Sequence, residues 1–362
     1  MKTYSTALIT GASSGIGEAF ARLLATQGTD LILVARSKDK LYRLSEELAE
    51  KHGIRADVIV ADLSAANAAR QVHEEVTGRG LSVDLLVNNA GFGSYGFFGE
   101  LPLERESQEI TLNVTALVEL THLFLPEMLA KRSGAIINVA STAAFQPLPY
   151  MAVYAATKAF VLSFSEALWA ECRLRGIRVL AFCPGPVDTG FAAAAGFADV
   201  SGPKFTSNAA TAASVAAAAI DALAQDRSYI VPGQENYWLS VSSRFAPRAL
   251  VAQMVERKMR PSELVPAPLM SEGSEAKSQE VANRGLVSTT SAVLRNTGAL
   301  AIGASAIGAL AFGAVAVGTL AIGSMAIKLL FVGKSRVRSL EIDELVIRRL
   351  VVKEQQLPTE AE

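Results

Sequence analysis

Cysteine and histidine are both scarce in this sequence. Among its 362 residues there are only two cysteines, Cys172 and Cys183, and three histidines. Small secreted domains held together by disulfides use more cysteine, so we expect a reducing compartment and a cytoplasmic protein. The histidines lie far apart along the chain and show no metal-ligand spacing, so no metal site is predicted.

An excess of either charge is also absent. The 34 lysines and arginines almost balance the 35 aspartates and glutamates. Proteins that bind nucleic acid normally carry a basic surplus, so nucleic acid is not expected as a partner. The N-terminal segment MKTYSTALITG has one lysine and no small-residue cleavage site after an apolar run of signal-peptide length. We expect it to form the first strand of the fold.

What the sequence does contain, over roughly its first 235 residues, is an alternation of short aliphatic runs and longer helical stretches. Continuous apolar runs are typical of strands buried on both faces of a parallel sheet. Repeated strand–helix alternation predicts an α/β fold with a doubly wound parallel sheet. The expected strands are ALIT, DLILVA, ADVIVAD, VDLLVNNA, GAIINVAS, IRVLAFCPG and SYIVPG, and the expected helices include 15–28, 38–52, 65–79, 104–131 and 152–175.

Composition divides the chain into four parts. The α/β pattern covers residues 1–262, with further helices expected in 237–260. Residues 263–296 are rich in Pro, Ser, Glu and Ala without periodicity, which predicts a linker. A repeat occupies 297–352, and a polar tail follows in 353–362.

The segment TGASSGIG (10–17) predicts a phosphate-binding turn at the end of the first strand. Gly11, Gly15 and Gly17 let the backbone approach a pyrophosphate, and the helix that begins there offers free N–H groups and a positive dipole end. A tight strand–helix turn needs glycine in any case, but the position at the first β–α junction favours dinucleotide binding.

The end of the second expected strand indicates which dinucleotide. A site for NAD usually places a carboxylate there, whereas this sequence has Arg36. A guanidinium there can pair with a 2′-phosphate, so NADPH/NADP is the expected cofactor; a solvated arginine is the alternative.

Asp62 follows the third strand and could accept a hydrogen bond from adenine. Asn88 and Gly91 end the fourth strand, where turn chemistry is the alternative explanation.

The segment YAATK places Tyr154 and Lys158 four residues apart, on one face of an expected helix. A tyrosine is a poor acid–base catalyst at neutral pH unless a nearby charge stabilises its phenolate, and a lysine one turn away supplies that charge. Ser141 could bond a substrate carbonyl oxygen, and Asn113 could hold a water in a proton relay. Each residue has an ordinary structural explanation, but together they predict carbonyl reduction by hydride transfer, with Tyr154 as the proton donor.

These motifs, with PGPVDT (184–189), resemble the short-chain dehydrogenase/reductase family, which has a Rossmann-type sheet. The resemblance covers roughly residues 3–260. It implies catalysis by Asn113, Ser141, Tyr154 and Lys158, with Lys158 bonding the nicotinamide ribose and lowering the pKa of the tyrosine. The branch that it resembles most includes DltE-like oxidoreductases and the hydroxysteroid and long-chain ketoacyl reductases. The implied cofactor-binding residues are Gly11, Ser13, Ser14, Gly15, Ile16, Gly17, Arg36, Asp62, Leu63, Asn88, Ala90, Gly91, Tyr154, Lys158, Pro184, Gly185, Val187 and Thr189.

A small-molecule carbonyl or its alcohol is the expected substrate. The family places its substrate loop after Thr189, where Phe191, Phe197 and Phe205 occur, and the apolar segments 92–102 and 145–151 lie on the other side. This lining predicts a hydrophobic ketone or alcohol, unless the same side chains merely pack the lid. Family members are often dimers or tetramers, so a homo-oligomer is expected.

Glycine recurs every five residues from 298 to 323, and the same register continues into the charged segment SLEIDELVIRRLVV (339–352). Apolar residues two apart share a strand face, so the pattern predicts a small C-terminal pentad-repeat β-solenoid. A membrane span has no reason to share its period with a charged segment. The alternative is a C-terminal transmembrane helix or hairpin, with membrane association through 297–333 and a membrane-associated location.

Two other functions remain open from the sequence. The chain could be a non-catalytic NADP-binding scaffold or assembly protein, although the complete set of catalytic residues argues against this. It could also be a membrane-tethered lipid or sterol ketoreductase.

Overall fold

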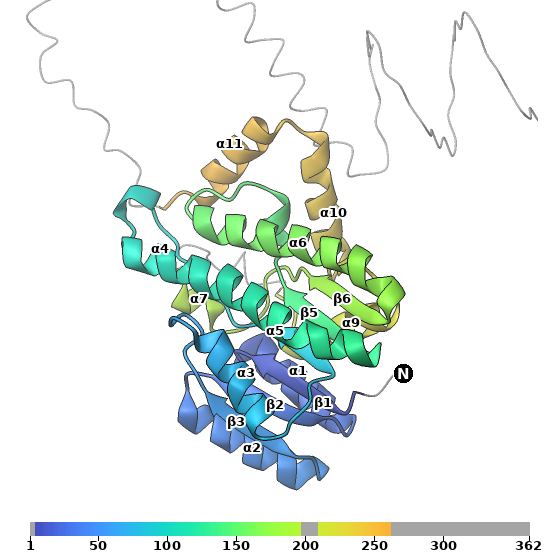
Figure 1. Cartoon of the computed structure of the whole chain (residues 1–362). Helices are drawn as coiled ribbons and strands as arrows, with labels where there is room; N and C mark the ends of the chain where they lie inside the picture. Colours follow the sequence, from blue (N-terminus) through green and yellow to red (C-terminus); the bar gives the residue numbers. More distant parts are fainter. Residues whose placement is uncertain (1–3, 197–208, 262–362) are drawn as a thin grey trace, which may run out of the picture. The chain divides into compact units, whose positions relative to one another are not determined.

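The computed structural model describes residues 4–196 and 209–261, and Figure 1 shows their arrangement. The expected linker, pentad repeat and tail in 263–362 lie outside the described residues, and those assignments stay predictions. The strands are β1 (Thr6–Thr10), β2 (Asp30–Ala35), β3 (Ala56–Val60), β4 (Leu85–Asn88), β5 (Gly134–Val139), β6 (Ile177–Phe182) and β7 (Tyr229–Ile230). The α-helices are α1 (Gly15–Thr26), α2 (Lys38–His52), α3 (Ala68–Gly78), α4 (Leu103–Ile110), α5 (Ala116–Lys131), α6 (Ala152–Cys172), α7 (Phe191–Ala194), α9 (Ala212–Ala224), α10 (Gln234–Ser242) and α11 (Arg248–Met259).

Shorter helical turns connect these elements. A π-helical turn, η2 (Thr111–Thr115), joins α4 to α5, so the expected helix 104–131 is continuous but irregular at its centre. The 3₁₀ turns are η1 (Phe98–Glu100), η3 (Thr142–Phe145), η4 (Arg173–Arg175) and η5 (Ser243–Phe245).

Within the described residues the seven strands form one parallel sheet in the order β3-β2-β1-β4-β5-β6-β7. The prediction of a doubly wound, Rossmann-type sheet is therefore confirmed. The order of strands reverses between β1 and β4, which lie side by side with Ala7 opposite Leu85. In sheets of this kind ligands bind where the order reverses, outside the carboxyl ends of the strands.

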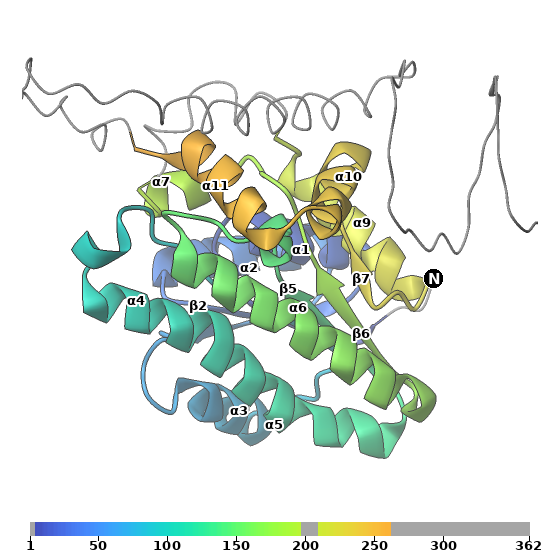
Figure 2. The ribbon, with the colours of Figure 1, turned by 90° about the horizontal axis from the view of Figure 1, so that it is seen from above.

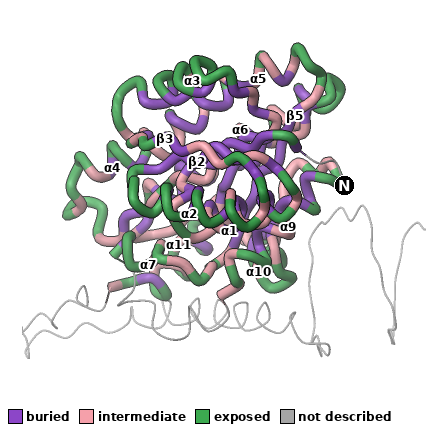
Figure 3. Tube along the Cα trace, turned by 90° about the horizontal axis from the view of Figure 1, so that it is seen from below, coloured by how far each residue is buried: buried purple, intermediate pink, exposed green. Residues whose placement is uncertain are grey.

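Helices cover both faces of the sheet, as Figure 2 shows. The core on one face joins strand residues to α1, α2 and α9, and the core on the other joins them to α3, α5 and the end of α6. In β1, Ile9 belongs to the first core and Leu8 to the second, and every residue of this strand is buried. This two-sided burial, visible as the purple interior in Figure 3, explains why the strand sequences are apolar throughout and do not alternate.

Cys172 and Cys183 are buried free thiols. No helix in residues 4–196 or 209–261 combines the length and apolarity needed to cross a bilayer.

Candidate active site

The predicted site residues all follow the carboxyl ends of strands or lie on the helices beside them. The glycine segment follows β1, Arg36 follows β2, and Asp62 and Leu63 follow β3. Asn88 ends β4, Ser141 follows β5, and the segment 184–189 follows β6. The topology therefore brings to one edge of the sheet motifs that lie more than 170 residues apart in the chain (Gly11 to Thr189).

In the turn after β1, the backbone at Gly17 lies close to the Gly11 carbonyl group and to the side chain of Asn89. Gly11 has a φ of +65°, a conformation that favours glycine. A Cβ on Gly17 would lie 2.4 Å from the Gly11 carbonyl oxygen and 2.5 Å from Asn89 Nδ2, so no larger residue fits there. The side chain of Ser14 makes no capping bond to α1, which leaves the N–H groups of Gly15, Ile16 and Gly17 available to an anion.

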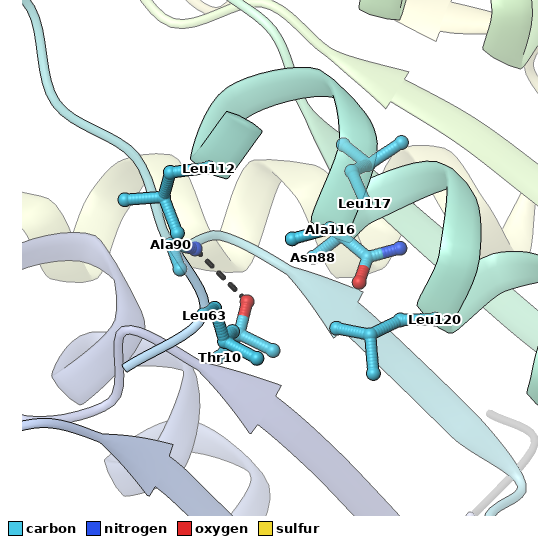
Figure 4. A pocket seen from close by; sticks show the side chains of 8 residues that line it. All are labelled: Thr10, Leu63, Asn88, Ala90, Leu112, Ala116, Leu117 and Leu120. Atoms are coloured by element: carbon cyan, nitrogen blue, oxygen red, sulfur yellow. Dashed lines mark hydrogen bonds between the residues drawn. The ribbon is translucent and has the colours of Figure 1, made fainter. Parts of the chain in front are cut away.

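Asn89 holds this turn in place, and the sequence analysis did not single it out from its neighbour Asn88. Its Nδ2 donates to the carbonyl oxygens of Thr10 (2.8 Å) and Gly11 (3.3 Å). The backbone N–H groups of Asn89 and Ala90 both donate to Thr10 Oγ1 at 2.9 Å, and the second of these bonds is drawn in Figure 4. The loop after β4 is therefore fastened directly to the phosphate-binding turn.

Asn88, by contrast, directs its side chain into the fold. Its Nδ2 donates to Thr121 Oγ1 (3.0 Å) and Asn138 Oδ1 (2.9 Å), and the residue is buried. It also lines a small pocket at the switch point, together with Leu63 and Ala90 (Figure 4). The structure thus gives Asn88 a clear role in joining β4 to β5 and α5, and any contact with a cofactor stays a prediction.

Arg36 and Asp62 face each other across the ends of β2 and β3. Arg36 Nη1 lies 3.8 Å from Asp62 Oδ2, and the Arg36 side chain is 71% exposed. Asp62 Oδ1 accepts from the N–H (3.0 Å) and hydroxyl (2.6 Å) of Ser64, and these bonds lower the pKa of Asp62, with Arg36 adding to the effect. An exposed guanidinium at this strand end has room for a phosphate, as the NADP hypothesis requires.

The segment 184–189 reaches the phosphate-binding turn from the other half of the sheet. A Cβ on Gly15 would lie 3.1 Å from Thr189 Cγ2, so the two motifs are in contact. Pro184 accepts a backbone bond from Thr142 (2.9 Å), and Val187 forms an isolated bridge to Ala210. Gly185 packs against Asn236 of α10, since a Cβ there would lie 2.4 Å from Asn236 Nδ2.

The four catalytic candidates converge beside this cradle. Tyr154 and Lys158 share one face of α6, and the Lys158 ammonium lies 5.8 Å from the centre of the Tyr154 ring. Ser141 precedes η3 and forms a hydrogen bond with Tyr154 that lowers the pKa of the phenol. A Cβ on Gly91 would lie 2.8 Å from Asn113 Oδ1 and 3.4 Å from Lys158 Nζ, so these two polar groups meet at Gly91.

Asn113 sits in the π-helical turn, a feature common at functional sites. Its Nδ2 donates to the Phe92 carbonyl (2.9 Å) and to Thr157 Oγ1 (3.1 Å), and its Oδ1 accepts from the Phe92 N–H (3.1 Å). The side chain therefore fixes the loop after β4 to α6. A water relay at Asn113 stays a prediction.

Burial is the largest influence on the ionisation of the Tyr154–Lys158 pair. Burial raises the pKa of Tyr154 to about 12, against the opposing hydrogen bond from Ser141. Burial also lowers the pKa of Lys158 to about 8, and its ammonium donates to the Val139 carbonyl oxygen at 2.8 Å. The lysine thus donates to the backbone of β5, and its effect on the pKa of Tyr154 stays a prediction.

Sequence reasoning also missed Glu109, a buried carboxyl on α4 whose charge acts on two of the catalytic candidates, Tyr154 and Lys158. Its spacing of four residues before Asn113 puts both on one helical face, which was the available signal. Glu109 Oε2 accepts from Ser94 Oγ at 2.9 Å, and burial raises the pKa of Glu109 to about 7.

Apolar and aromatic side chains surround the phenol of Tyr154. The Phe191 ring lies 5.3 Å from the Tyr154 ring, centre to centre, and both belong to a cluster with Met151 and Met259. Phe97 and Phe98, which the sequence placed in the same lining, are 52% and 62% exposed. Phe197 and Phe205 lie outside the described residues.

Helix α11 closes this side of the site, a role that the sequence did not indicate. Tyr95 Oη donates to the Met259 carbonyl oxygen (2.6 Å), and Tyr150 Oη donates to Glu256 Oε1 (2.7 Å). Tyr95 lies in the loop after β4, and Tyr150 lies just before α6, the helix of Tyr154 and Lys158. The end of the described α/β unit therefore helps to form the wall around Tyr154.

Known proteins resemble this chain over the same region. The family model described as short chain dehydrogenase matches residues 5–198, more than half of the 362 residues. A hydroxysteroid dehydrogenase-like protein 1 from Gallus gallus is 37% identical over 185 residues, which are 51% of this chain and 56% of that protein. A very-long-chain 3-oxoacyl-CoA reductase from Anas platyrhynchos is 37% identical over 190 residues, which are 51% of this chain and 60% of that protein. The chain thus spans about 56–60% of the length of these curated relatives.

A solved structure supports the likeness in three dimensions. A short-chain dehydrogenase from Sphingobium yanoikuyae in complex with NADPH is 32% identical, with a TM-score of 0.60. The match covers 71% of this chain and 97% of that one.

Proposed function

The chain belongs to the short-chain dehydrogenase family, and we propose that it is an NADPH-dependent oxidoreductase that interconverts a hydrophobic ketone or aldehyde and its alcohol. The observation that carries this proposal is the convergence of Ser141, Tyr154 and Lys158 beside the glycine cradle. A site with these groups can hold a carbonyl oxygen between two hydroxyls and deliver a proton to it.

Each polar group has a part in the proposed reaction. NADPH, when bound, supplies the hydride that is added to the carbonyl carbon. As negative charge develops on the carbonyl oxygen, Tyr154 donates its phenolic proton and Ser141 holds the oxygen by a hydrogen bond. Lys158 would bond the nicotinamide ribose and stabilise the resulting phenolate. Asn113 bonds Phe92 and so fixes the loop after β4 against α6, the helix of Tyr154 and Lys158.

Arg36 and the turn of residues 11–17 are the proposed binding groups for NADPH. The turn presents backbone N–H groups to the pyrophosphate, and the exposed guanidinium of Arg36 meets the 2′-phosphate. Complexes of similar enzymes with NADPH support this choice of cofactor.

A bulky apolar carbonyl compound is the substrate class that fits the wall around Tyr154. Phe191, Met151 and Met259 offer aromatic and aliphatic surface there. Arg105 on α4 donates to the backbone carbonyl oxygens of Gly93 (3.3 Å) and Ala194 (2.8 Å), so its guanidinium is engaged in structure. The likeness to a hydroxysteroid dehydrogenase-like protein and to a very-long-chain 3-oxoacyl-CoA reductase supports placement in the branch with hydroxysteroid and ketoacyl reductases, and the DltE-like part of the assignment rests on sequence alone.

The proposal extends to the whole chain as a cytoplasmic, homo-oligomeric enzyme whose pentad repeat serves in assembly. Sequence alone supports these parts. Fractionation of cells that express the chain with and without residues 290–362 tests the expected location. Recovery of the full chain with membranes, and of the shortened chain without them, would favour the membrane-associated alternative.

Replacement of the proposed proton donor is the direct test. We expect Tyr154→Phe to lower the rate of NADPH oxidation with a panel of hydrophobic ketones by about 100-fold or more, because general acid catalysis contributes about that much. Tyr42→Phe, at a tyrosine on α2 that is 46% exposed, is the control and should keep the full rate. An unchanged rate in the Tyr154→Phe variant would refute the mechanism.

A further inference from the structure

Glu109 is a buried carboxyl that the proposed reaction does not use. It lies on α4, one turn before Asn113, and its side chain has no exposed surface. Its Oε2 accepts from Ser94 Oγ (2.9 Å), whereas its Oε1 has no hydrogen-bond partner among the described residues. A half-satisfied carboxyl in the interior is costly, so its presence there calls for a reason beyond packing.

The contacts of Glu109 lead directly to the catalytic tyrosine. Ser94 follows Gly93, and a Cβ on Gly93 would lie 3.1 Å from Tyr154 Cδ2, so this loop passes against the tyrosine ring. Arg105 Nε also donates to Ser94 Oγ (3.2 Å), which fixes the hydroxyl between the guanidinium and the carboxyl. The loop residues Gly93 and Ser94 thus connect Glu109 to the tyrosine ring.

Charge from Glu109 acts on both members of the catalytic pair. It raises the pKa of Tyr154 and opposes the lowering of the pKa of Lys158 by burial. The other group acting on Lys158 is the Cys183 thiol, whose own pKa is raised by burial, so it stays neutral. Glu109 is therefore the carboxylate whose charge both groups sense.

The groups that face Glu109 place its own titration near neutrality. On α4, Glu106 raises the pKa of Glu109 and Arg105 lowers it. Lys158 and Tyr154 face Glu109 from α6, and Ser94 faces it from the loop after β4. Burial is the largest cause and raises the pKa of Glu109 to about 7. The carboxyl is thus neutral in acid and charged just where Lys158 begins to lose its proton.

We propose that Glu109 is a positioning residue that, once ionised, holds the proton on the Tyr154–Lys158 pair and so preserves the proton-donating form of the site in the reductive direction. A nearby negative charge increases the proton affinity of both groups, whereas burial alone lowers the pKa of the lysine. Because the two groups are coupled, the effect belongs to the pair. This inference rests on the proposed function of the site.

The test compares pH profiles of kcat/KM for NADPH-dependent ketone reduction. We expect Glu109→Gln to match the wild type in acid and to lose rate earlier in base, its basic limb shifted down by roughly 0.5–1 pH unit. Glu109→Asp keeps the charge and should restore the wild-type midpoint even at a lower rate. Glu104→Gln, at an exposed residue of the same helix, is the matched control and should leave the profile unchanged.

Ser94→Ala gives a second variant that does not alter the carboxyl itself. Loss of the Ser94 hydrogen bond should raise the pKa of Glu109 further and delay its effect to higher pH. If the Glu109→Gln profile differs from the wild type only in height, with the same midpoint, Glu109 is merely structural and the proposal is wrong.

A measurement without turnover separates this inference from the proposed function. In full-length protein labelled with ¹³C at lysine Cε, the Lys158 resonance, assigned from a Lys158→Met sample, is titrated with pH. We expect its midpoint to fall in Glu109→Gln and to stay in place in Glu104→Gln. A wild type that reduces no ketone refutes the proposed function, whereas an unmoved Lys158 midpoint refutes the role of Glu109.

Discussion

At the scale of single residues, burial and hydrogen-bond partners distinguish side chains that the sequence treats alike. Asn88 and Asn89 are neighbours in one motif, yet Asn88 joins β4 to β5 and α5 while Asn89 fastens the phosphate-binding turn. Arg36 and Lys158 are both cations near the proposed cofactor. Arg36 is 71% exposed and lies 3.8 Å from Asp62, whereas Lys158 is buried and its pKa is lowered.

The exposed guanidinium of Arg36 should decide between the two nicotinamide dinucleotides. We expect Arg36→Ala to lower kcat/KM for NADPH by about 10- to 100-fold, because a charge-assisted bond is worth about 1.5–3 kcal/mol. The value for NADH should change little, since NADH has no 2′-phosphate to lose a partner. Arg43→Ala, at an exposed arginine of α2, is the control. An equal loss for both dinucleotides would show that Arg36 does not select the cofactor.

At the scale of elements, the junction between β1 and α1 depends on close approach to the loop after β4. Gly17 is in contact with the Gly11 carbonyl and with Asn89, so the first turn of α1 lies directly against both. The π-helical turn at Thr111–Thr115 similarly places Asn113 against Phe92 and Thr157. Both junctions are formed by segments distant in sequence.

Gly17→Ala should damage the β1–α1 junction. Its Cβ would lie 2.4 Å from a carbonyl oxygen, so the turn must shift, and we expect weaker NADPH binding together with a lower melting temperature. Gly78→Ala, at the end of α3, is the matched control, because a Cβ there meets nothing within 4 Å. Alanine at this helical position should stabilise the protein by about 0.5–1 kcal/mol. Equal binding and stability in the two variants would contradict this account of the turn.

At the scale of the whole described unit, the buried groups of the active site make stability depend on pH. Glu109 has a pKa raised from 4.5 to about 7, so the folded state binds its proton more tightly than the unfolded chain. This contribution to stability is fully present below pH 4.5 and is lost as pH rises through about 7. Lys158 has its pKa lowered from 10.5 to about 8, so its contribution has the opposite sign and stability is regained between those two values.

Thermal unfolding of the wild type and Glu109→Gln across pH 4.5–8 tests this dependence. Glutamine does not titrate, so we expect the wild type to lose stability relative to the variant over this range. The loss should reach at most about 3 kcal/mol, or several degrees in melting temperature. Glu104→Gln should run parallel to the wild type. Melting curves of Glu109→Gln that also run parallel to the wild type would contradict the raised pKa.

The sequence by itself determined the parallel α/β sheet and the set of candidate catalytic residues. Strands buried on both faces must be apolar throughout, and a nucleotide-binding turn requires glycine, so both features leave local patterns that can be recognised. All seven expected strands were found, and the helix expected at 38–52 has those bounds in the structure. The alanine-rich α9, which packs against α1, lacks a comparable local signal and was not anticipated.

Only the tertiary structure decided how these residues are ionised and held. Burial is a property of the packed chain, and it raises the pKa of Tyr154 and lowers that of Lys158 regardless of their spacing on α6. The same packing brings Glu109 within electrostatic reach of both, and brings α11 to the wall of the site through Tyr95 and Tyr150. A sequence pattern identifies chemical groups, but their charge depends on desolvation and neighbours, which exist only once the chain has folded.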